Sequence, residues 1–523
     1  MKAVRDCSAP GGHPATRSSC YVILSLVLLL AGCASLPEDY TRTETAAFPD
    51  HLDTSIGRLF ETAAKEHPGY SGFGMITGGR DAFTARIGLS DLAEKTLDLQ
   101  YYIWEADATG RILTDRLIRA ADRGVRVRVL VDDISASGRD DRIATAAAHP
   151  NIEIRIFNPF ANRKAAFLDV LGDFNRINHR MHNKIMIVDN AFAIVGGRNI
   201  GDIYFQVADD ANYRDLDIAA AGPVVRETSD VFDHFWNGPW AVPIEALVKH
   251  EFTMEELQEA TIGLRQQIAE DDYPHPLDSD VEELRTALKT LSDRLIWAPG
   301  WIVWDDPAAI EKGGQARGIL DALQRKVETL DKELLIESAY FVMQDPSLET
   351  LRELEERGVR VRVLTNSLAS NDVIAAHAGH AAHREQLIED GVELYEMRAD
   401  ADEIQKSVIS GKSRASLHTK AMAFDGDSVF IGSFNLDPRS AKINTEAGLY
   451  VESPELAEQL VAYMDEGVRT ENSYQVVLDE DDDLVWVTEI DGEEARLTKE
   501  PGASVTNSIL TWIIQVLPVE DQL

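Results

Sequence analysis

The sequence contains few cysteines and has no long hydrophobic run. Only three of the 523 residues are cysteine, namely Cys7, Cys20 and Cys33, and all three lie near the start. A disulfide framework is therefore excluded for the rest of the chain, and a core of this size needs no such cross-links. The apolar run Tyr21 to Leu30 is shorter than the roughly 20 residues that cross a bilayer, so we expect no spanning helix there.

Positive charge is also scarce in this chain. Lys and Arg number 51 against 89 Asp and Glu, which gives a formal net charge of -38. Nucleic-acid phosphates are bound through Lys and Arg, so no nucleic-acid partner is expected. Hydrophobic residues make up 44% and charged residues 27%, which is typical of a folded globular protein, and the length predicts two domains.

The start of the chain has the pattern of an export signal. Basic residues precede the apolar run, and Leu30-Ala31-Gly32-Cys33 follows it. This ending resembles the lipobox of bacterial lipoproteins, which implies a signal peptide over residues 1–32 and lipidation of Cys33. A plain secretory signal cut nearby, or an uncleaved anchor, is the alternative.

A lipidated Cys33 would place the protein in the bacterial cell envelope. We expect it on the periplasmic side, anchored to a membrane by lipid, with residues 33–55 as a tether. Ala34 and Ser35 resemble the corresponding residues of outer-membrane lipoproteins, so the outer membrane is one candidate location.

The rest of the chain is built from two copies of one pattern. A strand, a helix and a strand are predicted over residues 96–131 and again over residues 334–364. The copies match literally where Gly124 to Leu130 corresponds to Gly358 to Leu364. Two long copies indicate a duplicated α/β domain, because solenoid repeats are shorter and more numerous. Parallel strands with crossover helices are the expected layout.

These patterns predict two repeated α/β domains with pseudo-twofold symmetry, each a mixed, mainly parallel sheet flanked by helices. The predicted division is an N-terminal domain over 56–239, a helical connector over 240–305, a C-terminal domain over 306–475 and an acidic extension over 476–523. Within the extension we expect a strand at Leu484 to Thr488. An apolar helix face follows from Val505 to Val516, which we expect to pack on the protein, with membrane contact as the alternative.

A His-x-Lys-x4-Asp sequence occurs at the same place in each copy. The first motif is His182, Lys184 and Asp189, and the second is His418, Lys420 and Asp425. Residues two apart in a strand point to the same face, so each copy projects one histidine and one lysine together. Pairing of the two copies would gather two of each around one anion.

A glycine and an amide follow each motif. The sequences are Gly196 to Asn199 in the first copy and Gly432 to Asn435 in the second. Asn199 and Asn435 offer amide hydrogens for a phosphate, and glycine allows a ligand to approach the backbone.

The paired motifs resemble the HKD motifs of the phospholipase D superfamily, and the resemblance covers roughly residues 80 to 460. It implies phosphodiester chemistry without a metal or other cofactor. It further implies that His182 is the nucleophile, forming a phosphohistidine, and that His418 is the general acid and base. Lys184 and Lys420, together with Asn199 and Asn435, would bind the phosphate.

Carboxylates downstream of each motif are expected to orient the histidines. By resemblance, Glu446 takes this role, Asp215 is its counterpart in the first copy, and Asp217 is an alternative to Asp215. Asp189 and Asp425 belong to the catalytic motifs, yet we expect them to anchor the turn between two strands and not to carry protons.

Within the superfamily the chain resembles the bacterial cardiolipin synthases, and the C type among them. The segments that carry this resemblance are Leu99 to Trp104, Arg180 to Lys184, Gly197 to Asp202, Leu364 to Ser367 and Ser433 to Ser440. The chain departs from the relatives at Ala339, where proline is common.

This resemblance implies phosphatidyl transfer between phospholipids. A phosphatidyl group on His182 would pass to the hydroxyl of phosphatidylglycerol and give cardiolipin, with phosphatidylethanolamine as a further substrate. Water as the acceptor would give phosphatidic acid, so a hydrolase (a phospholipase or a nuclease) is the alternative, and a catalytically silent surface lipoprotein is a third hypothesis. We expect a monomer.

Two further clusters invite other interpretations. His377, His380 and His383 recur at a spacing of three, as in a metal stripe, but such residues rotate away from one another on a helix. A helix face near the substrate cleft is the preferred interpretation. Tyr101, Tyr102 and Trp104 could line a lipid channel, although core packing is the preferred explanation for aromatics at strand spacing.

Overall fold

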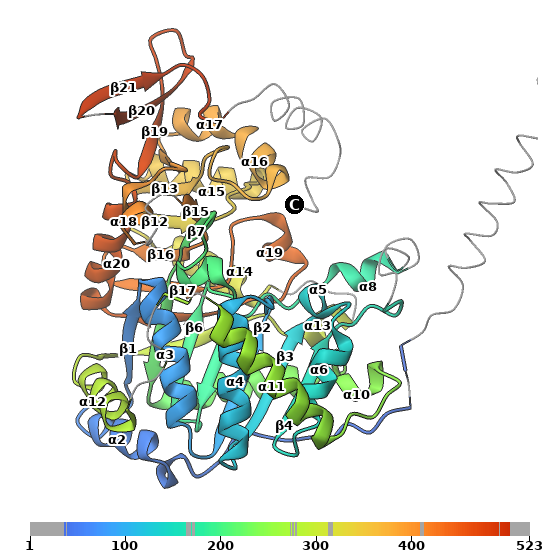
Figure 1. Ribbon diagram of the computed structural model, residues 1–523. Coiled ribbons are helices and arrows are strands. Elements are labelled where there is room, and N and C mark those ends of the chain that lie inside the picture. Colours follow the sequence, from blue (N-terminus) through green and yellow to red (C-terminus); the bar gives the residue numbers. More distant parts are fainter. Residues whose placement is uncertain are drawn as a thin grey trace, which may run out of the picture.

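The computed structural model describes residues 36–502 except 38, 164–168, 170–172, 272, 275–276, 278–279, 312–316, 408–412 and 491. Two β-sheets, one in each half of the chain, form its framework (Figure 1). The predicted anchor Cys33 and the predicted apolar helix face at Val505 to Val516 lie outside the described residues. Within the described part, none of the helices combines the length and the apolar character needed to cross a bilayer.

The first sheet contains the strands that lead into and out of the first motif. Its strands, in spatial order, are β10 (Ile296–Ala298), β1 (Ser71–Ile76), β8 (Asp217–Ala221), β6 (Phe192–Gly196), β5 (Ile185–Val188), β2 (Thr96–Tyr101), β3 (Arg126–Asp132), β4 (Ile152–Phe157) and β9 (Ala241–Pro243).

The second sheet repeats this order and is longer at one edge. Its strands are β11 (Gly300–Trp304), β18 (Ala447–Glu452), β17 (Ser428–Gly432), β16 (Lys420–Phe424), β12 (Glu333–Ser338), β13 (Arg360–Asn366), β14 (Glu393–Met397), β19 (Ser473–Leu478), β20 (Leu484–Ile490) and β21 (Glu493–Leu497). The strand predicted at Leu484 to Thr488 is therefore confirmed as β20.

The prediction of mainly parallel sheets is wrong, although the α/β class and the duplication are confirmed. Parallel pairing is limited, among the described strands of the two sheets, to β2–β3–β4 and β12–β13–β14; the other pairings are antiparallel. The sequence signal came from the crossover units, which require parallel strands. The motif strands instead return through tight turns, and such turns produce antiparallel neighbours.

Helices flank both sheets. In the first half they are α2 (Ser55–Ala64), α3 (Gly79–Leu92), α4 (Ala108–Asp122), α5 (Asp133–Ala136), α6 (Asp140–Ala147), α8 (Phe174–Asn178), α9 (Pro223–Asn237), α10 (Ile244–Leu247), α11 (Met254–Glu270) and α12 (Val281–Ser292). In the second half they are α13 (Pro307–Glu311), α14 (Gly318–Val327), α15 (Asp345–Glu356), α16 (Ile374–Ala381), α17 (Arg384–Glu389), α18 (Asp402–Ser407), α19 (Pro438–Lys442) and α20 (Pro454–Gly467). Short 3-10 turns occur at His51–Asp53 and Asp202–Phe205.

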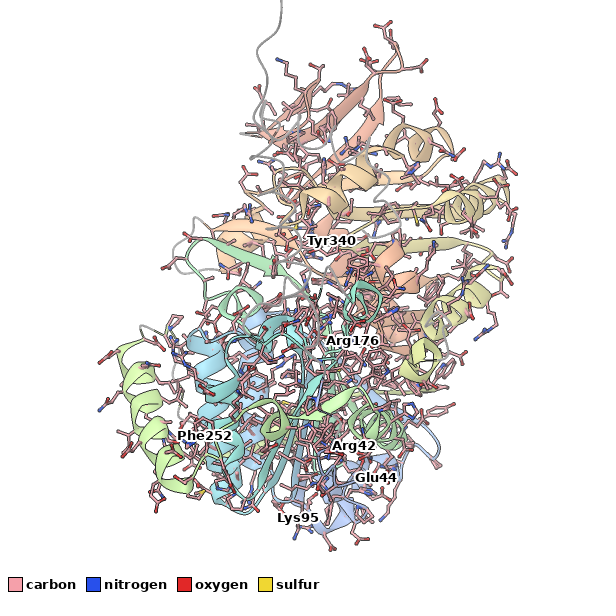
Figure 2. The ribbon with its side chains drawn as sticks, turned by 90° about the vertical axis from the view of Figure 1, so that its right-hand side faces the viewer. Arg42, Glu44, Lys95, Arg176, Phe252 and Tyr340 are labelled. Carbon is pink, nitrogen blue, oxygen red and sulfur yellow. The ribbon has the colours of Figure 1, made fainter. Side chains whose placement is uncertain are left out.

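The inner faces of the two sheets share one hydrophobic core. Ile187 and Val195 of the first sheet belong to the same buried cluster as Val429 and Ile431 of the second, and α9 and α20 complete it. Separate clusters lie on the outer face of each sheet, beneath α3 and α4 in the first half and beneath α14 and α15 in the second. Figure 2 shows one half above the other, with Lys95 and Phe252 in the lower half and Tyr340 near the level where they meet. Burial of this shared core holds the two motifs in a fixed relation.

A small parallel sheet also joins the halves. It pairs β7 (Ala211–Arg214) with β15 (Arg414–Leu417), so the segment before Asp215 runs beside the segment before His418. Arg214 leaves this sheet and forms buried ion pairs with Glu337 of the second half, at 3.1 Å, and with Glu403. Its backbone oxygen accepts a hydrogen bond from the backbone N–H of His418 at 2.8 Å. The contact between the halves thereby sets the backbone position of the second histidine.

The segment predicted as a connector contributes to both sheets. Its predicted helices are observed as α11 and α12, which pack on α4 and α3 of the first half. Strands β9 and β10 of the same segment are the two edges of the first sheet, and β11 is an edge of the second.

Candidate active site

Each motif lies in and around a hairpin whose turn is fixed by the motif aspartate. Asp189 accepts hydrogen bonds from the backbone N–H groups of residues 94–96, and Asp425 accepts them from residues 331–333. Both aspartates have positive φ, 54° and 53°, at the turn that follows the motif strand. These contacts tie the hairpin to the neighbouring strand, as expected for turn anchors.

His182 is held by a carboxylate from the other copy. Its Nδ1 lies 2.8 Å from Oε2 of Glu446, and its backbone N–H donates to the oxygen of Thr445 at 2.8 Å. Two serine hydroxyls, those of Ser433 at 2.5 Å and Ser440 at 2.8 Å, donate to the same carboxylate. With Nδ1 occupied in this way, Nε2 of His182 is left for chemistry.

His418 is held in the same way by the first copy. Its Nδ1 lies 2.7 Å from Oδ2 of Asp215, and the Asp215 side chain is fully buried. The orienting carboxylates are therefore exchanged between the two copies, so neither half supplies a complete histidine–carboxylate pair. Asp217, the alternative, forms ion pairs with Arg86 at 2.9 Å and Arg198 at 3.3 Å instead.

The glycine of the first motif segment makes room for this carboxylate. A Cβ on Gly197 would lie 2.1 Å from Oδ1 of Asp215, so a larger residue would displace the partner of His418. The corresponding position in the second copy is Ser433, which binds Glu446 directly. We expected glycine to allow a ligand near the backbone, whereas the atom that approaches Gly197 belongs to the protein.

The two lysines lie beside the histidines and are fully buried. The Nζ atoms of Lys184 and Lys420 each donate to the backbone oxygen of the motif histidine two residues earlier. Burial lowers the pKa of Lys420 to about 8, although Asp215 and Glu446 oppose this change. Burial and the charge of Lys420 also lower the pKa of Lys184 well below its usual value.

The histidine pKa values show that the two motifs act on one another. Burial, then the charges of Lys184, Lys420 and His418, lower the pKa of His182 well below its ordinary value. Burial, then Lys420, lower the pKa of His418. Burial and the neighbouring lysines thus disfavour the charged form of both imidazoles, whereas the charge and hydrogen bond of Asp215 favour the charged form of His418.

The orienting carboxylates differ from each other in their electrostatics. Burial acts to raise the pKa of Asp215, but the charge and hydrogen bond of His418 outweigh it, so this pKa lies below its usual value. Burial raises the pKa of Glu446 to about 7, against the opposing charge of Lys184. Asp215 is therefore a permanent anion, whereas the charge of Glu446 depends on pH near neutrality.

Aromatic rings that the motifs do not include surround both histidines. The Tyr102 ring meets His182 edge-on at a centroid distance of 4.9 Å, and Lys184 lies 5.3 Å above the same ring. Tyr213 stacks on His418 at 4.9 Å, and Tyr204 meets His418 edge-on at 5.1 Å. Tyr101 instead lies in the core, where its hydroxyl binds Arg86.

The side chains of the predicted phosphate-binding amides are both buried. Asn199 is 1% and Asn435 is 2% exposed. Asn199 Oδ1 accepts a hydrogen bond from the backbone N–H of Ile103, the residue after Tyr102. This hydrogen bond orients the amide group of Asn199. Asn435 lies two residues after Ser433, which binds Glu446.

Two of the three histidines of the stripe bind glutamate carboxylates. His377 binds Glu500 at 2.9 Å and His380 binds Glu396 at 3.1 Å, and Arg384 binds both glutamates at 2.8 Å. Across the part of the chain that the structure describes, there is no group of three or more His, Cys, Asp or Glu side chains that could hold a metal ion.

Together these residues form one anion site with two imidazoles. Two lysines can neutralise nonbridging phosphate oxygens and two amides can donate hydrogen bonds to them, while the histidines are placed to act as a nucleophile and a proton carrier. The motif residues, the amides, the carboxylates and Tyr102 were named from the sequence. Tyr204 and Tyr213 were not named, and neither the exchange of carboxylates nor the serines on Glu446 were predicted. Tyr213 lies two residues before Asp215, a spacing that could have indicated it.

Comparisons with known proteins agree with this geometry. The family model described as "Cardiolipin synthase, PLD-like domain" matches residues 89–236 and 325–467. The chain is 39% identical over 464 residues to cardiolipin synthase C of Escherichia coli, covering 87% of this chain and 97% of that protein. It is 31% identical over 445 residues to an uncharacterized protein of Helicobacter pylori, covering 84% of this chain and 88% of that protein.

A solved structure has the same fold. Phosphatidylserine synthase of Haemophilus influenzae aligns over 89% of this chain and 100% of its own, with a TM-score of 0.57 and 13% sequence identity.

Proposed function

The chain belongs to the cardiolipin synthase family, which is part of the phospholipase D superfamily and consists of phospholipid phosphatidyltransferases. From this premise we propose that the protein makes cardiolipin through a phosphohistidine intermediate. The observation that carries the proposal is the exchanged pairing of His182 with Glu446 and of His418 with Asp215. This pairing leaves one Nε2 from each copy to serve a single phosphorus atom.

In the first step Nε2 of His182 attacks the phosphorus of a donor phospholipid. The bond from phosphorus to the headgroup oxygen breaks, and His418 gives its proton to that oxygen, so the headgroup leaves as an alcohol. Lys184 and Lys420 neutralise the charge on the nonbridging oxygens. The phosphatidyl group is now bonded to His182.

In the second step the hydroxyl of phosphatidylglycerol attacks the same phosphorus. His418, now neutral, accepts the hydroxyl proton, and the bond between phosphorus and His182 breaks. The product is cardiolipin and both histidines are restored. Phosphatidylglycerol or phosphatidylethanolamine serves as the donor, with glycerol or ethanolamine as the leaving alcohol.

A product assay tests the proposal. Purified protein is incubated with phosphatidylglycerol, with and without phosphatidylethanolamine, and the lipids are identified by mass spectrometry. We expect cardiolipin, and we expect the His182→Ala variant to form neither cardiolipin nor a covalent intermediate. Phosphatidic acid as the sole product would instead identify a phospholipase, and cleavage of DNA by a protein inert toward lipids would identify a nuclease.

We also propose that Cys33 is lipidated and anchors the protein on the periplasmic side of the cell envelope. The support is the Leu-Ala-Gly-Cys ending of the apolar run. Cys33→Ser should move the protein from the membrane fraction to the soluble fraction without changing its thermal unfolding midpoint. Membrane association that persists in Cys33→Ser would exclude lipid anchoring at this residue.

A further inference from the structure

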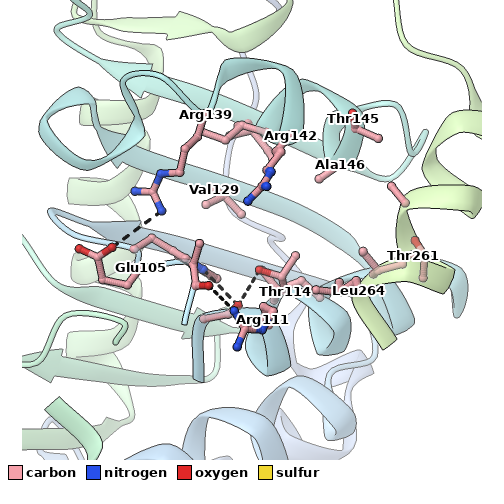
Figure 3. Close-up of a pocket in the computed structure, with 18 of the residues that line it drawn as sticks. Glu105, Arg111, Thr114, Val129, Arg139, Arg142, Thr145, Ala146, Thr261 and Leu264 are labelled. Carbon is pink, nitrogen blue, oxygen red and sulfur yellow. Dashed lines mark hydrogen bonds and ion pairs between the residues drawn. The ribbon is translucent and has the colours of Figure 1, made fainter. Parts of the chain in front are cut away.

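A cavity of about 630 Å³ lies beside the active site in the first half (Figure 3). Its floor is the outer face of β3 and β4, where Val129, Val131, Ile152 and Ile154 line it. The helices α4 and α6 form its walls, and α11 closes it from outside through residues such as Leu257 and Leu264. A volume in this range and an apolar floor are typical of a small-molecule site.

The cavity is connected to His182 through the segment from Tyr102 to Trp104. Ser135 and Trp104 both line the cavity. The Ser135 hydroxyl donates to the backbone oxygen of Tyr102 at 3.3 Å and accepts from the Trp104 N–H at 3.2 Å. Tyr102 in turn contacts His182. The segment from Tyr102 to Trp104 therefore has the catalytic site at one end and the cavity at the other.

Charged side chains lie at the cavity's polar edge. Arg111 pairs with Asp271 at 2.6 Å, and Arg139 lies 4.0 Å from Glu105. Within the described ranges neither Arg142 nor Glu270, which also lines the cavity, has an ion pair, and Figure 3 shows the Arg142 side chain extending from α6 over Val129. The arginines and the carboxylates that line the cavity are equal in number, so its apolar floor, which suits a hydrocarbon chain, is the feature that selects the ligand.

We infer that this cavity binds one acyl chain of a phospholipid, which enters past Trp104 from the side of His182. The inference rests on the proposed function for its choice of a phospholipid over a free fatty acid, because both present the same chain and a negative head. Each methylene that leaves water adds about 0.8 kcal/mol of transfer free energy, so an acyl chain gains affinity in such a cavity. The inference also gives α11 a role, because this helix closes the cavity.

Quenching of tryptophan fluorescence can test the inference without turnover. The full chain carrying His182→Ala is titrated, in detergent micelles, with phosphatidylglycerol that has dibromostearoyl chains, and separately with free dibromostearic acid. Bromine quenches a tryptophan on contact, and Trp104 is the tryptophan among the cavity-lining residues. We expect saturable quenching by the brominated phospholipid, and we expect Trp104→Phe to remove that component.

Variants that fill the cavity provide the comparison. Thr261→Phe adds a ring to the inner side of α11, whereas Ile262→Phe changes a neighbouring residue whose side chain is 60% exposed. Thr261→Phe should weaken binding roughly tenfold or more, and Ile262→Phe should leave it unchanged. Ala146→Phe on the opposite wall should act like Thr261→Phe, and it serves as the test if Thr261→Phe does not fold.

Three results would overturn the inference. The first is that the brominated phospholipid quenches the parent and the Trp104→Phe variant equally. The second is that Thr261→Phe and Ile262→Phe bind the phospholipid equally well. The third is that free dibromostearic acid quenches and the brominated phospholipid does not. Because the assay measures binding by an inactive variant, it is separate from the product assay above. A chain that makes no cardiolipin but passes this test would overturn the proposed function and leave the cavity assignment intact.

Discussion

At the scale of single residues, the exchange of carboxylates is the feature on which we expect catalysis to depend most. Glu446 fixes Nδ1 of His182 and is itself fixed by Ser433 and Ser440. An amide in its place would keep the shape but lose the charge that selects the tautomer. We expect Glu446→Gln to lower kcat by roughly 100-fold or more, by analogy with other histidine–carboxylate pairs.

Initial rates of cardiolipin formation would measure this effect. Ser440→Ala removes one of the two serine hydrogen bonds to Glu446 and should cost much less, about tenfold. A rate for Glu446→Gln within a factor of two of the parent would show that the pair does not orient the nucleophile.

The buried lysines predict an alkaline limit to activity. Lys420 must carry charge to neutralise phosphate oxygens, and burial lowers its pKa to about 8. The charged form is therefore lost as the pH rises through about 8, and kcat/KM should fall there. Arginine keeps its charge throughout this range, so Lys420→Arg should move the decline to higher pH even if its maximal rate is lower. A decline at the same pH in both proteins would assign it to another group.

The motif residues were predictable because their chemistry depends on a short local spacing. His182, Lys184, His418 and Lys420 are recognisable within a few positions of chain. The contacts of Glu446 were not predictable in this way, because His182 lies in the other copy and no spacing within one copy encodes that contact. The orientation of Tyr213 toward His418 likewise depends on the pairing of β7 with β15.

At the scale of elements, the hairpin that carries each motif is held by one aspartate. Asp189 is fully buried and Asp425 is half-buried, yet both bind backbone N–H groups of the adjoining segment. Asp189→Ala leaves these groups unpaired away from water and should reduce the free energy of unfolding by about 3 kcal/mol. Asp425→Ala should cost less, about 1 kcal/mol, because water can replace the carboxylate.

Urea unfolding of the two variants would measure this difference. Among molecules that remain folded, the loss of activity should be far smaller than in His182→Ala. A catalytic defect in Asp189→Ala as severe as that of His182→Ala, at unchanged stability, would show that the aspartate takes part in the chemistry.

The crossover units were predictable as elements, whereas the edges of the sheets were not. The alternating patterns before and after α4 and α15 became β2, β3, β12 and β13. Short edge strands such as β9 and β10 have three residues each, which is too few for a period to be visible. Their place in the sheet follows from tertiary packing.

At the scale of the whole molecule, the structure makes one active site from one chain. The shared core between the sheets and the buried pair of Arg214 with Glu337 fix the halves against each other. Each half supplies one histidine and the carboxylate for the other. Duplication has thus produced halves that depend on one another for function.

This dependence predicts the outcome of mixing two inactive variants. In the proposed mechanism His182→Ala lacks the nucleophile and His418→Ala lacks the proton carrier, so each should be inactive alone. Because both histidines of a site come from the same chain, a mixture of the two folded variants should remain inactive over a wide range of protein concentration. Recovery of cardiolipin synthesis that grows with concentration would instead require sites shared between chains, and would contradict a monomeric enzyme.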